Sequence, residues 1–366
     1  MADEALEAFI ENVCGDSHLR VETDLGDGFV RLRSAEAERR QAAHDIRSTE
    51  DIVIEMLRNA RDAQAKNVFL AVTREGGRRR LVMVDDGCGI PAALHGRVFE
   101  PRVTSKLDTM HLDKWGVHGR GMALYSIAVN SESARVAASA PGLGSSLLVE
   151  TDLERVGEKT DQSTFPTFEQ TESGAFAMRG PRNVLRTACE FALEHRHECT
   201  VYCGSASDVA ATLYAFGYAT LSAAMRAFCP DVGALPVCKR LAVAADPSAF
   251  AQVADSLGLD VSERTARRIM DGSIPPLDSL LDRIRAEGFE DEGAPAGGAK
   301  APRRPKPARD ARGLKLSAED AVELKGQVRS AFADIARRYY LEEDVEPVLR
   351  VGKNALHITI PVEKLR

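Results

Sequence analysis

The stretch EDIVIEMLRNARDAQAKNV, from Glu50 to Val68, decides how the rest of this chain is interpreted. Its apolar residues Ile52, Met56 and Leu57 recur at helical spacing, which predicts an amphipathic helix. Ser48 and Thr49, just before the stretch, are both residue types that commonly cap a helix N-terminus. The pattern therefore predicts a helix that begins near Ser48 or Thr49 and buries one apolar face.

Three polar residues of this predicted helix share a face of their own. Glu55, Asn59 and Asp62 are four and three residues apart, so their side chains lie on one side of the helix. A carboxylate at such a place can take a proton from water. A carboxamide oxygen can bind Mg²⁺, which prefers oxygen ligands. The alternative is a solvated helix face with ordinary contacts between successive turns.

The next block, LVMVDDGCGIP from Leu81 to Pro91, combines a buried strand with a turn. Asp85 ends the apolar run and could accept a hydrogen bond from an amino group such as that of adenine. Gly87 and Gly89 follow, and glycine lets the backbone approach a flat ligand closely. The alternative is a plain turn, because Asp-Gly is a common turn signal.

Two further blocks, FEPRVTSK (99–106) and WGVHGRGMALYSI (115–127), add glycine and positive charge. Glycines that open a helix expose backbone N–H groups to an anion, and the helix dipole adds to this attraction. Cationic side chains nearby can contact phosphates. The residues concerned are Lys106, Gly116, Gly119, Arg120 and Gly121.

The four blocks in this order resemble the GHKL ATPases, which include gyrase B subunits, heat-shock chaperones, histidine kinases and MutL. Residues 55–63 match the pattern ExxxNxxDA of the N box, and residues 85–90 match DxGxGI of the G1 box. The TSK of residues 104–106 resembles the MutL lid, and residues 116–121 resemble the G2 lid hinge. Gly144-Ser145-Ser146 resembles a later Gly-Thr block near adenine.

The resemblance implies an α/β fold of the Bergerat type, a sandwich of a mixed sheet with helices on one face. It implies ATP and Mg²⁺ as cofactors, Glu55 as the general base, Asn59 as the Mg²⁺ ligand and Asp85 as the acceptor for the adenine amine. Asp86 replaces the frequent Asn and Ser146 the common Thr. The other cofactor-binding positions it implies are Asp62, Gly87, Gly89, Lys106, Gly116, Gly119, Arg120, Gly121 and Ser146.

The length of 366 residues is enough for two or three domains. We expect the ATP-binding domain first, then a small α/β or transducer-like region, a helical region, a basic linker rich in Pro, Ala and Gly, and a C-terminal helix with a hairpin. The expected bounds are residues 1–153, 154–246, 247–290, 291–313 and 314–366.

Residues 247–288 resemble a helix-turn-helix of the phage-repressor type. Its second helix would show Arg264, Arg267 and Arg268, and arginines on such a helix can contact DNA. With the basic linker, residues 247–313 form a possible DNA-binding region. The alternative is a plain helical hairpin with a solvated basic face.

The net charge of −7 argues against the whole molecule being an electrostatic binder of nucleic acid. Seven cysteines without a signal peptide or a membrane-length apolar run predict free thiols in a reducing cytoplasm. The run from His195 and His197 to Cys199 and Cys203 could bind zinc. We favour the alternative, a strand whose cysteines lie in the core.

The function expected from these patterns is Mg²⁺-dependent ATP hydrolysis. ATP would close a lid formed by residues 97–119 over its phosphates, and hydrolysis would reopen it. A protein kinase of the histidine-kinase type is one alternative, and a DNA-binding regulator that uses ATP only as a ligand is another. The expected partners are ATP, DNA through residues 247–313, a protein client, and a second copy of the chain in an ATP-dependent dimer, but no membrane.

Overall fold

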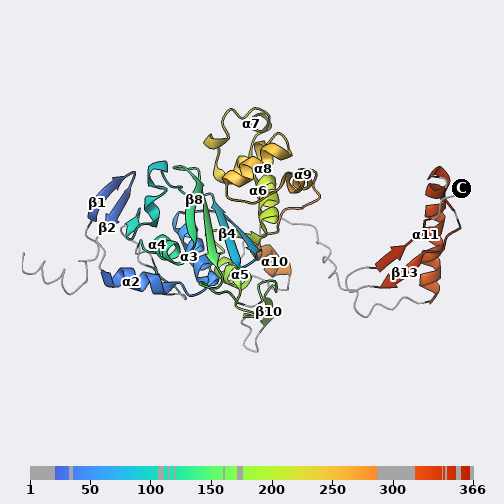
Figure 1. Cartoon of the computed structure of the whole chain (residues 1–366), viewed down its shortest axis with the longest axis horizontal. Helices are drawn as coiled ribbons and strands as arrows, with labels where there is room; N and C mark the ends of the chain where they lie inside the picture. Colours follow the sequence, from blue (N-terminus) through green and yellow to red (C-terminus); the bar gives the residue numbers. More distant parts are fainter. Residues whose placement is uncertain are drawn as a thin grey trace, which may run out of the picture. The chain divides into compact units, whose positions relative to one another are not determined.

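A five-stranded mixed sheet lies at the centre of the computed structural model, in the order β12-β3-β4-β9-β8 (Figure 1). Runs of apolar and β-branched residues suit its strands to a position buried on both faces. β12 pairs with β3 in parallel, and the other neighbours pair antiparallel. The strands are β3 (Asn67–Glu75), β4 (Arg78–Asp85), β8 (Ser133–Ser139), β9 (Ser145–Asp152) and β12 (Thr200–Gly204).

The chain divides into two units, Met1–Gly293 and Ala294–Arg366. Among the residues that the structure describes, no helix is both long and apolar enough to cross a membrane. The described residues are 21–32, 36–105, 111–113, 116–118, 121–159, 161–170, 176–286, 318–339, 341–342, 344–351 and 356–362.

Helix α3 (Thr49–Asp62) packs on the first face of the sheet. The Ser48 side chain accepts from the backbone N–H of Asp51, and the Asp51 carboxylate accepts from that of Ser48. This capping box satisfies N–H groups that the helix cannot pair internally. Ile52, Met56 and Leu57 are fully buried. The helix predicted from the Glu50–Val68 stretch is confirmed.

Four more helices complete the layer on this face. Together with α3 they cover an apolar core that includes Leu70 and Met83 of the sheet. α2 packs against α4, α5 packs against α3, and α10 packs against α5 and β12. These helices are α2 (Glu36–Asp45), α4 (Ala123–Asn130), α5 (Val184–Glu194) and α10 (Leu280–Ala286).

The second face of the sheet is also covered by helices (Figure 1). Phe69, Val82 and Leu148 point to this side and are buried, because alternate residues of a strand face opposite ways. The α/β fold class with a mixed sheet is confirmed, and the helices on the second face all come from segments beyond residue 153. The covering elements are α6 (Ala206–Thr220), the 3₁₀ helix η5 (Val237–Val243), α8 (Pro247–Ser256) and α9 (Glu263–Met270).

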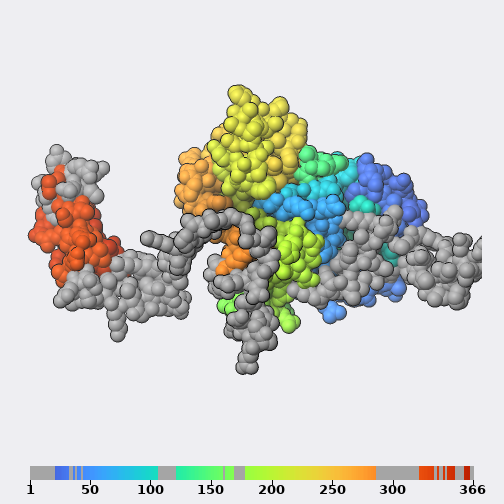
Figure 2. All heavy atoms as spheres, turned by 180° about the vertical axis from the view of Figure 1, so that it is seen from behind, coloured from blue at the N-terminus to red at the C-terminus, as the bar shows by residue number. Residues whose placement is uncertain are grey.

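β12 joins residues beyond 153 to the same sheet as the motif region. Its backbone is in register with β3 from Thr200 opposite Asn67 to Gly204 opposite Ala71. Figure 2 shows the blue atoms of the early chain directly against the green and yellow atoms of later segments. Residues 154–246, expected to form a small α/β or transducer-like region, thus contribute β12 to this sheet and α6 and η5 to its second face. The run KRLAVAAD, residues 239–246, has the composition of a strand, but its first five residues belong to η5.

The residues that resemble a helix-turn-helix, 247–288, are divided between the two faces of the sheet. α8 and α9 form a pair around Gly258, whose φ of +80° suits glycine. Ala254 and Ala266 of this pair are buried on the second face of the sheet. α10 packs on the first face instead, through Leu280 and Ile284. The pair therefore resembles a helical hairpin docked on the sheet, and the third helix belongs elsewhere.

Smaller elements surround the sheet. A hairpin with its turn around Gly26-Asp27-Gly28 pairs with β5 through its second strand. The short elements are β1 (Val21–Gly26), β2 (Phe29–Leu32), η2 (Ala92–Leu94), η3 (Arg97–Phe99), β5 (Val103–Thr104), β6 (His111–Asp113), β7 (Gly116–His118), β10 (Thr167–Gln170), β11 (Phe176–Arg179), α7 (Ala223–Ala227) and η4 (Val232–Ala234).

The second unit holds a long helix and a hairpin. α11 spans Ala318–Tyr339, and β13 (Val348–Val351) pairs antiparallel with β14 (Leu356–Thr359). These elements match the helix and hairpin expected for the C-terminal region. The expected basic linker, residues 291–313, lies outside the described residues.

Candidate functional site

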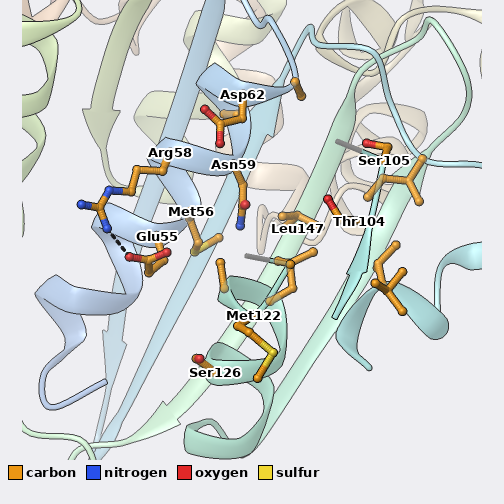
Figure 3. Close-up of a pocket in the computed structure, with 18 of the residues that line it drawn as sticks. Glu55, Met56, Arg58, Asn59, Asp62, Thr104, Ser105, Met122, Ser126 and Leu147 are labelled. Carbon is orange, nitrogen blue, oxygen red and sulfur yellow. Dashed lines mark hydrogen bonds and ion pairs between the residues drawn. The ribbon is translucent and has the colours of Figure 1, made fainter. Parts of the chain in front are cut away.

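A cavity of 720 Å³ lies between α3, α4, the ends of β4 and β9, and residues 98–105 (Figure 3). This volume is in the range of pockets that hold small molecules and cofactors. Its lining combines apolar side chains such as Met83 and Leu147 with a few polar groups. The structure therefore brings the early sequence blocks together around one hollow.

Helix α3 brings Glu55, Asn59 and Asp62 to the wall of this cavity. Figure 3 shows the three on successive turns of one helix. Asp62 accepts hydrogen bonds from Arg61, whose Nε and Nη2 lie 3.0 and 2.7 Å from its Oδ1. The helical spacing read from the sequence thus gives one shared polar face.

The Asn59 amide carries an unsatisfied polar atom. Its Nδ2 is buried and has no hydrogen-bond partner among the described residues. The two ends of an amide are assigned from their hydrogen bonds, so the oxygen could equally face this position. An amide oxygen directed into a cavity is a suitable Mg²⁺ ligand. The residue therefore fits the metal that the resemblance implies.

Asp85 lies at the end of β4, in the lining of the same cavity, and is 3% exposed. Ser145 Oγ donates to its Oδ2 at 2.5 Å, and the Gly87 N–H donates to its Oδ1 at 2.8 Å. Burial raises the pKa of Asp85 to about 6, and the two hydrogen bonds oppose this rise. The site thus presents a buried, oriented carboxyl group that can accept a hydrogen bond.

Asp86, the second carboxylate of this block, has a structural role. Its Oδ1 accepts from the backbone N–H groups of Lys66 and Asn67, at 2.7 and 2.8 Å. Its Oδ2 accepts from Asn67 Nδ2 at 2.8 Å. Asp86 therefore fastens the start of β3 and stands apart from Glu55 and Asn59.

Glycine is required where backbone segments meet below the cavity. A Cβ atom on Gly89, whose φ is +71°, would lie 2.0 Å from the carbonyl oxygen of Ala140. One on Gly144, whose φ is +78°, would lie 2.1 Å from the carbonyl oxygen of Asp85. A Cβ on Gly87 would lie 2.7 Å from the carbonyl oxygen of Ala63. The glycines of the G1 block thus allow the loop to fold tightly against Asp85.

The expected role of Ser146 is corrected by the structure. Ser146 is fully buried on the second face of the sheet, where its Oγ donates to the carbonyl oxygen of Leu257 at 2.7 Å. Its neighbour Ser145 faces the cavity and contacts Asp85. The two serines differ because consecutive residues of a strand point to opposite faces.

Several predicted positions cannot be compared with this geometry. Lys106, Gly119 and Arg120 lie outside the described residues, and Gly116 begins the short strand β7.

Two residues that line the cavity, Ser145 and Arg58, were not among the site residues predicted from the sequence. The spacing of Arg58 from Glu55, three residues along a helix, was a signal that could have identified it.

The predicted alternative to a zinc site agrees with the structure. His195 contacts Glu198 through Nδ1 at 2.8 Å and Arg61 through Nε2 at 3.2 Å. Cys203 lies in the core, where burial raises the pKa of its thiol to about 12. No cluster of three or more His, Cys, Asp or Glu residues suited to a metal occurs within the described part of the chain.

Residues 44–155 match the family described as histidine kinase-, DNA gyrase B-, and HSP90-like ATPase. The match includes α3, β3, β4 and β9 and every described residue predicted for the site. This segment therefore belongs to the GHKL superfamily, as its motifs indicated.

The relatives found in comparison are DNA mismatch repair proteins MutL. That of Carboxydothermus hydrogenoformans is 38% identical over 85 residues, which cover 22% of this chain and 14% of the relative. That of Aquifex aeolicus is 35% identical over 105 residues, 27% of this chain and 24% of the relative. That of Aquifex pyrophilus is 33% identical over the same extent. The similarity thus spans less than a quarter of these proteins.

Proposed function

We propose that the cavity binds ATP with Mg²⁺ and that the protein hydrolyses the nucleotide. The observation that carries this proposal is the convergence of Glu55, Asn59 and Asp85 on one cavity from two elements, α3 and the end of β4. Membership of residues 44–155 in an ATPase superfamily supports the choice of ligand.

Asp85 would hold the base. Its carboxylate can accept a hydrogen bond from the adenine amine, while Ser145 and Gly87 keep it oriented. The apolar side chains Met83 and Leu147 nearby suit a flat ring. A guanine base presents a carbonyl oxygen at the corresponding position, so this arrangement favours adenine.

Asn59 would bind the metal and Glu55 would act as the general base. Bound Mg²⁺ would neutralise charge on the phosphate oxygens. The water oxygen bonds to the γ-phosphorus, and the bond from that phosphorus to the bridging oxygen breaks with its electrons kept by ADP. Glu55 takes the proton that the water loses and later returns it to solvent.

The test compares ATP binding and phosphate release in the wild type and in Glu55→Gln. We expect ATP affinity to change by less than about fivefold and turnover to fall by about 10²- to 10⁴-fold, the usual contribution of a general base. Glu75→Gln is the matched control, because Glu75 is an exposed carboxylate at the end of β3. Loss of binding and turnover together in Glu55→Gln would contradict the assigned role.

The same assay separates the alternatives. A wild type that labels itself or a partner with the γ-phosphate, without releasing phosphate, would be a kinase. A wild type that binds ATP and does neither would use the nucleotide only as a ligand. An ATP-dependent dimer and a protein client remain predictions that sedimentation with and without nucleotide, and affinity purification, can test.

A second proposal is contact with DNA through α9. Arg264, Arg267 and Arg268 are exposed on this helix, and the relatives are named as DNA mismatch repair proteins. We expect replacement of the three arginines by Gln to weaken DNA binding and to reduce its salt dependence. Arg135→Gln with Arg182→Gln is the control, since both arginines are exposed outside α9. Unchanged affinity at low salt would remove the proposal.

A further inference from the structure

Arg58 is a buried cation in the wall of the candidate nucleotide cavity. Its side chain is only 4% exposed, and its Nη1 donates to Oε1 of Glu55 (Figure 3). Glu55 lies three residues earlier on α3, and its side chain is 19% exposed. The residue proposed as the general base is therefore bonded to a positive charge that α3 itself supplies.

Stability alone gives no reason for an arginine at this position. A buried guanidinium is costly unless it is paired and hydrogen-bonded, and apolar replacements of a buried ion pair often leave stability equal or greater. Arg58 adjoins Leu57 and Ile54, which are buried in the core. The guanidinium of Arg58 contacts the Glu55 carboxylate, so its charge has a partner in the wall of the candidate site.

The hydrogen bond from Arg58 restricts the side chain of Glu55, which would otherwise adopt several conformations. Glutamate has three rotatable bonds, and each added freedom lowers the fraction of time that its carboxylate faces a given point. α3 is held by its capping box and by its buried apolar residues, so Arg58 is presented from a fixed backbone. A neighbouring positive charge also favours the ionised form of a carboxylate, which is the form a general base needs.

We propose that Arg58 is a positioning residue that orients Glu55 for proton transfer from the attacking water. The inference rests on the proposed ATP hydrolysis and adds a residue to it. Arg58 holds Oε1 of Glu55, and the proton of the water goes to the second carboxylate oxygen, Oε2. Arg58 keeps all its protons throughout and makes no bond to the reacting atoms.

The experiment is a double-mutant cycle on the full chain. Phosphate release gives kcat and KM, calorimetry with Mg·ATP gives the affinity, and thermal unfolding reports the fold. The proteins are the wild type, Arg58→Met, Glu55→Gln and the double variant. Arg58→Lys tests rescue by a conservative charge, and Arg135→Met serves as a control at an exposed arginine.

We expect Arg58→Met to lower kcat by about 10- to 100-fold, the effect of a misplaced catalytic group. Its ATP affinity should stay within about threefold of the wild type, and Arg58→Lys should recover part of the lost rate. In the Glu55→Gln background, Arg58→Met should cause no further loss, because an effect exerted through Glu55 disappears with it.

Two results would overturn the inference alone. An equal loss of kcat in both backgrounds would mean that Arg58 acts independently of Glu55. A drop of more than about tenfold in ATP affinity at unchanged kcat would make Arg58 a phosphate ligand. A wild type that folds and binds ATP without turnover would instead overturn the proposed hydrolysis, and this inference with it.

Discussion

Asp85 is a carboxyl group in a buried position, and burial disfavours the charged form of such a group. Burial raises its pKa from the usual value of 3.8 to about 6, while hydrogen bonds from Ser145 and Gly87 favour the ionised form. The neutral form is therefore stabilised in the folded protein relative to the unfolded chain. A bound amino group would reverse part of this preference by donating to the carboxylate.

The raised pKa predicts how pH affects the stability of the nucleotide-free protein. Asp85 contributes stability that is fully present below pH 3.8 and is lost as the pH rises to about 6. The contribution amounts to about 3 kcal/mol at most, from the shift of roughly two pKa units. Asp85→Asn should remove it. Urea denaturation should therefore show that the difference in free energy of unfolding between wild type and variant changes between pH 4 and 7. A constant difference would contradict the buried carboxyl.

Asn59 gives a second prediction, from its unsatisfied amide. Asn59→Ala removes the oxygen that would bind Mg²⁺, so ATP affinity should become almost independent of Mg²⁺ and fall by about tenfold or more. Calorimetry with ATP, with and without Mg²⁺, measures this. Adenosine is the control ligand, because it has no phosphate to share a metal, and its affinity should stay the same. Equal Mg²⁺ dependence in both proteins would exclude Asn59 as the ligand.

Strand β9 connects the two faces of the molecule through adjacent residues. Ser145 contacts Asp85 in the cavity, and Ser146 contacts the Leu257 carbonyl at the end of α8. The Val237 N–H donates to the carbonyl of Leu143, at 2.8 Å, just before β9. One short segment of backbone therefore supports both the candidate adenine site and the helices on the second face.

Replacing the two serines one at a time should affect ATP binding in one variant and the stability of the fold in the other. Ser146→Ala leaves a buried carbonyl without its donor, which should reduce the free energy of unfolding by about 1–3 kcal/mol with unchanged ATP affinity. Ser145→Ala should weaken ATP binding instead, since Asp85 loses the group that orients it. Urea denaturation and calorimetry on both variants give the comparison. Weaker ATP binding in Ser146→Ala than in Ser145→Ala would contradict the assignment.

The first unit depends on segments from well beyond the family match. Residues 44–155 supply four of the five strands, but β12 and the helices on the second face come later in the chain. Phe69, Val82 and Leu148 would be exposed to water without those helices. The hydrophobic free energy of burying them is therefore available only to a longer chain.

Truncation tests this dependence. A chain ending after Gly293 should keep the urea midpoint and ATP affinity of the full protein, because the second unit is a separate body. A chain ending at residue 155 should aggregate or unfold, because it exposes the second face and the edge of β3. Circular dichroism and gel filtration give the result. A stable, monomeric fragment of residues 1–155 would show that the later helices are dispensable.

Local patterns were enough to predict α3, the strand of Leu81–Asp85 and the cavity residues these two elements carry. Helical spacing relates Glu55, Asn59 and Asp62 within three turns of one helix. The Asp-Gly turn follows its strand directly. Such features depend on contacts between residues that are close in the chain, so they appear in the sequence as a regular spacing of residue types.

Tertiary structure decided which surfaces meet. β12 pairs with β3 although Thr200 and Asn67 are far apart in the chain, and no local pattern specifies a strand's partner. The choice between Ser145 and Ser146 depends on strand register, since a shift of one residue turns a side chain to the opposite face. An apolar stripe indicates that a face is buried but not by what, because hydrophobic burial is not directional.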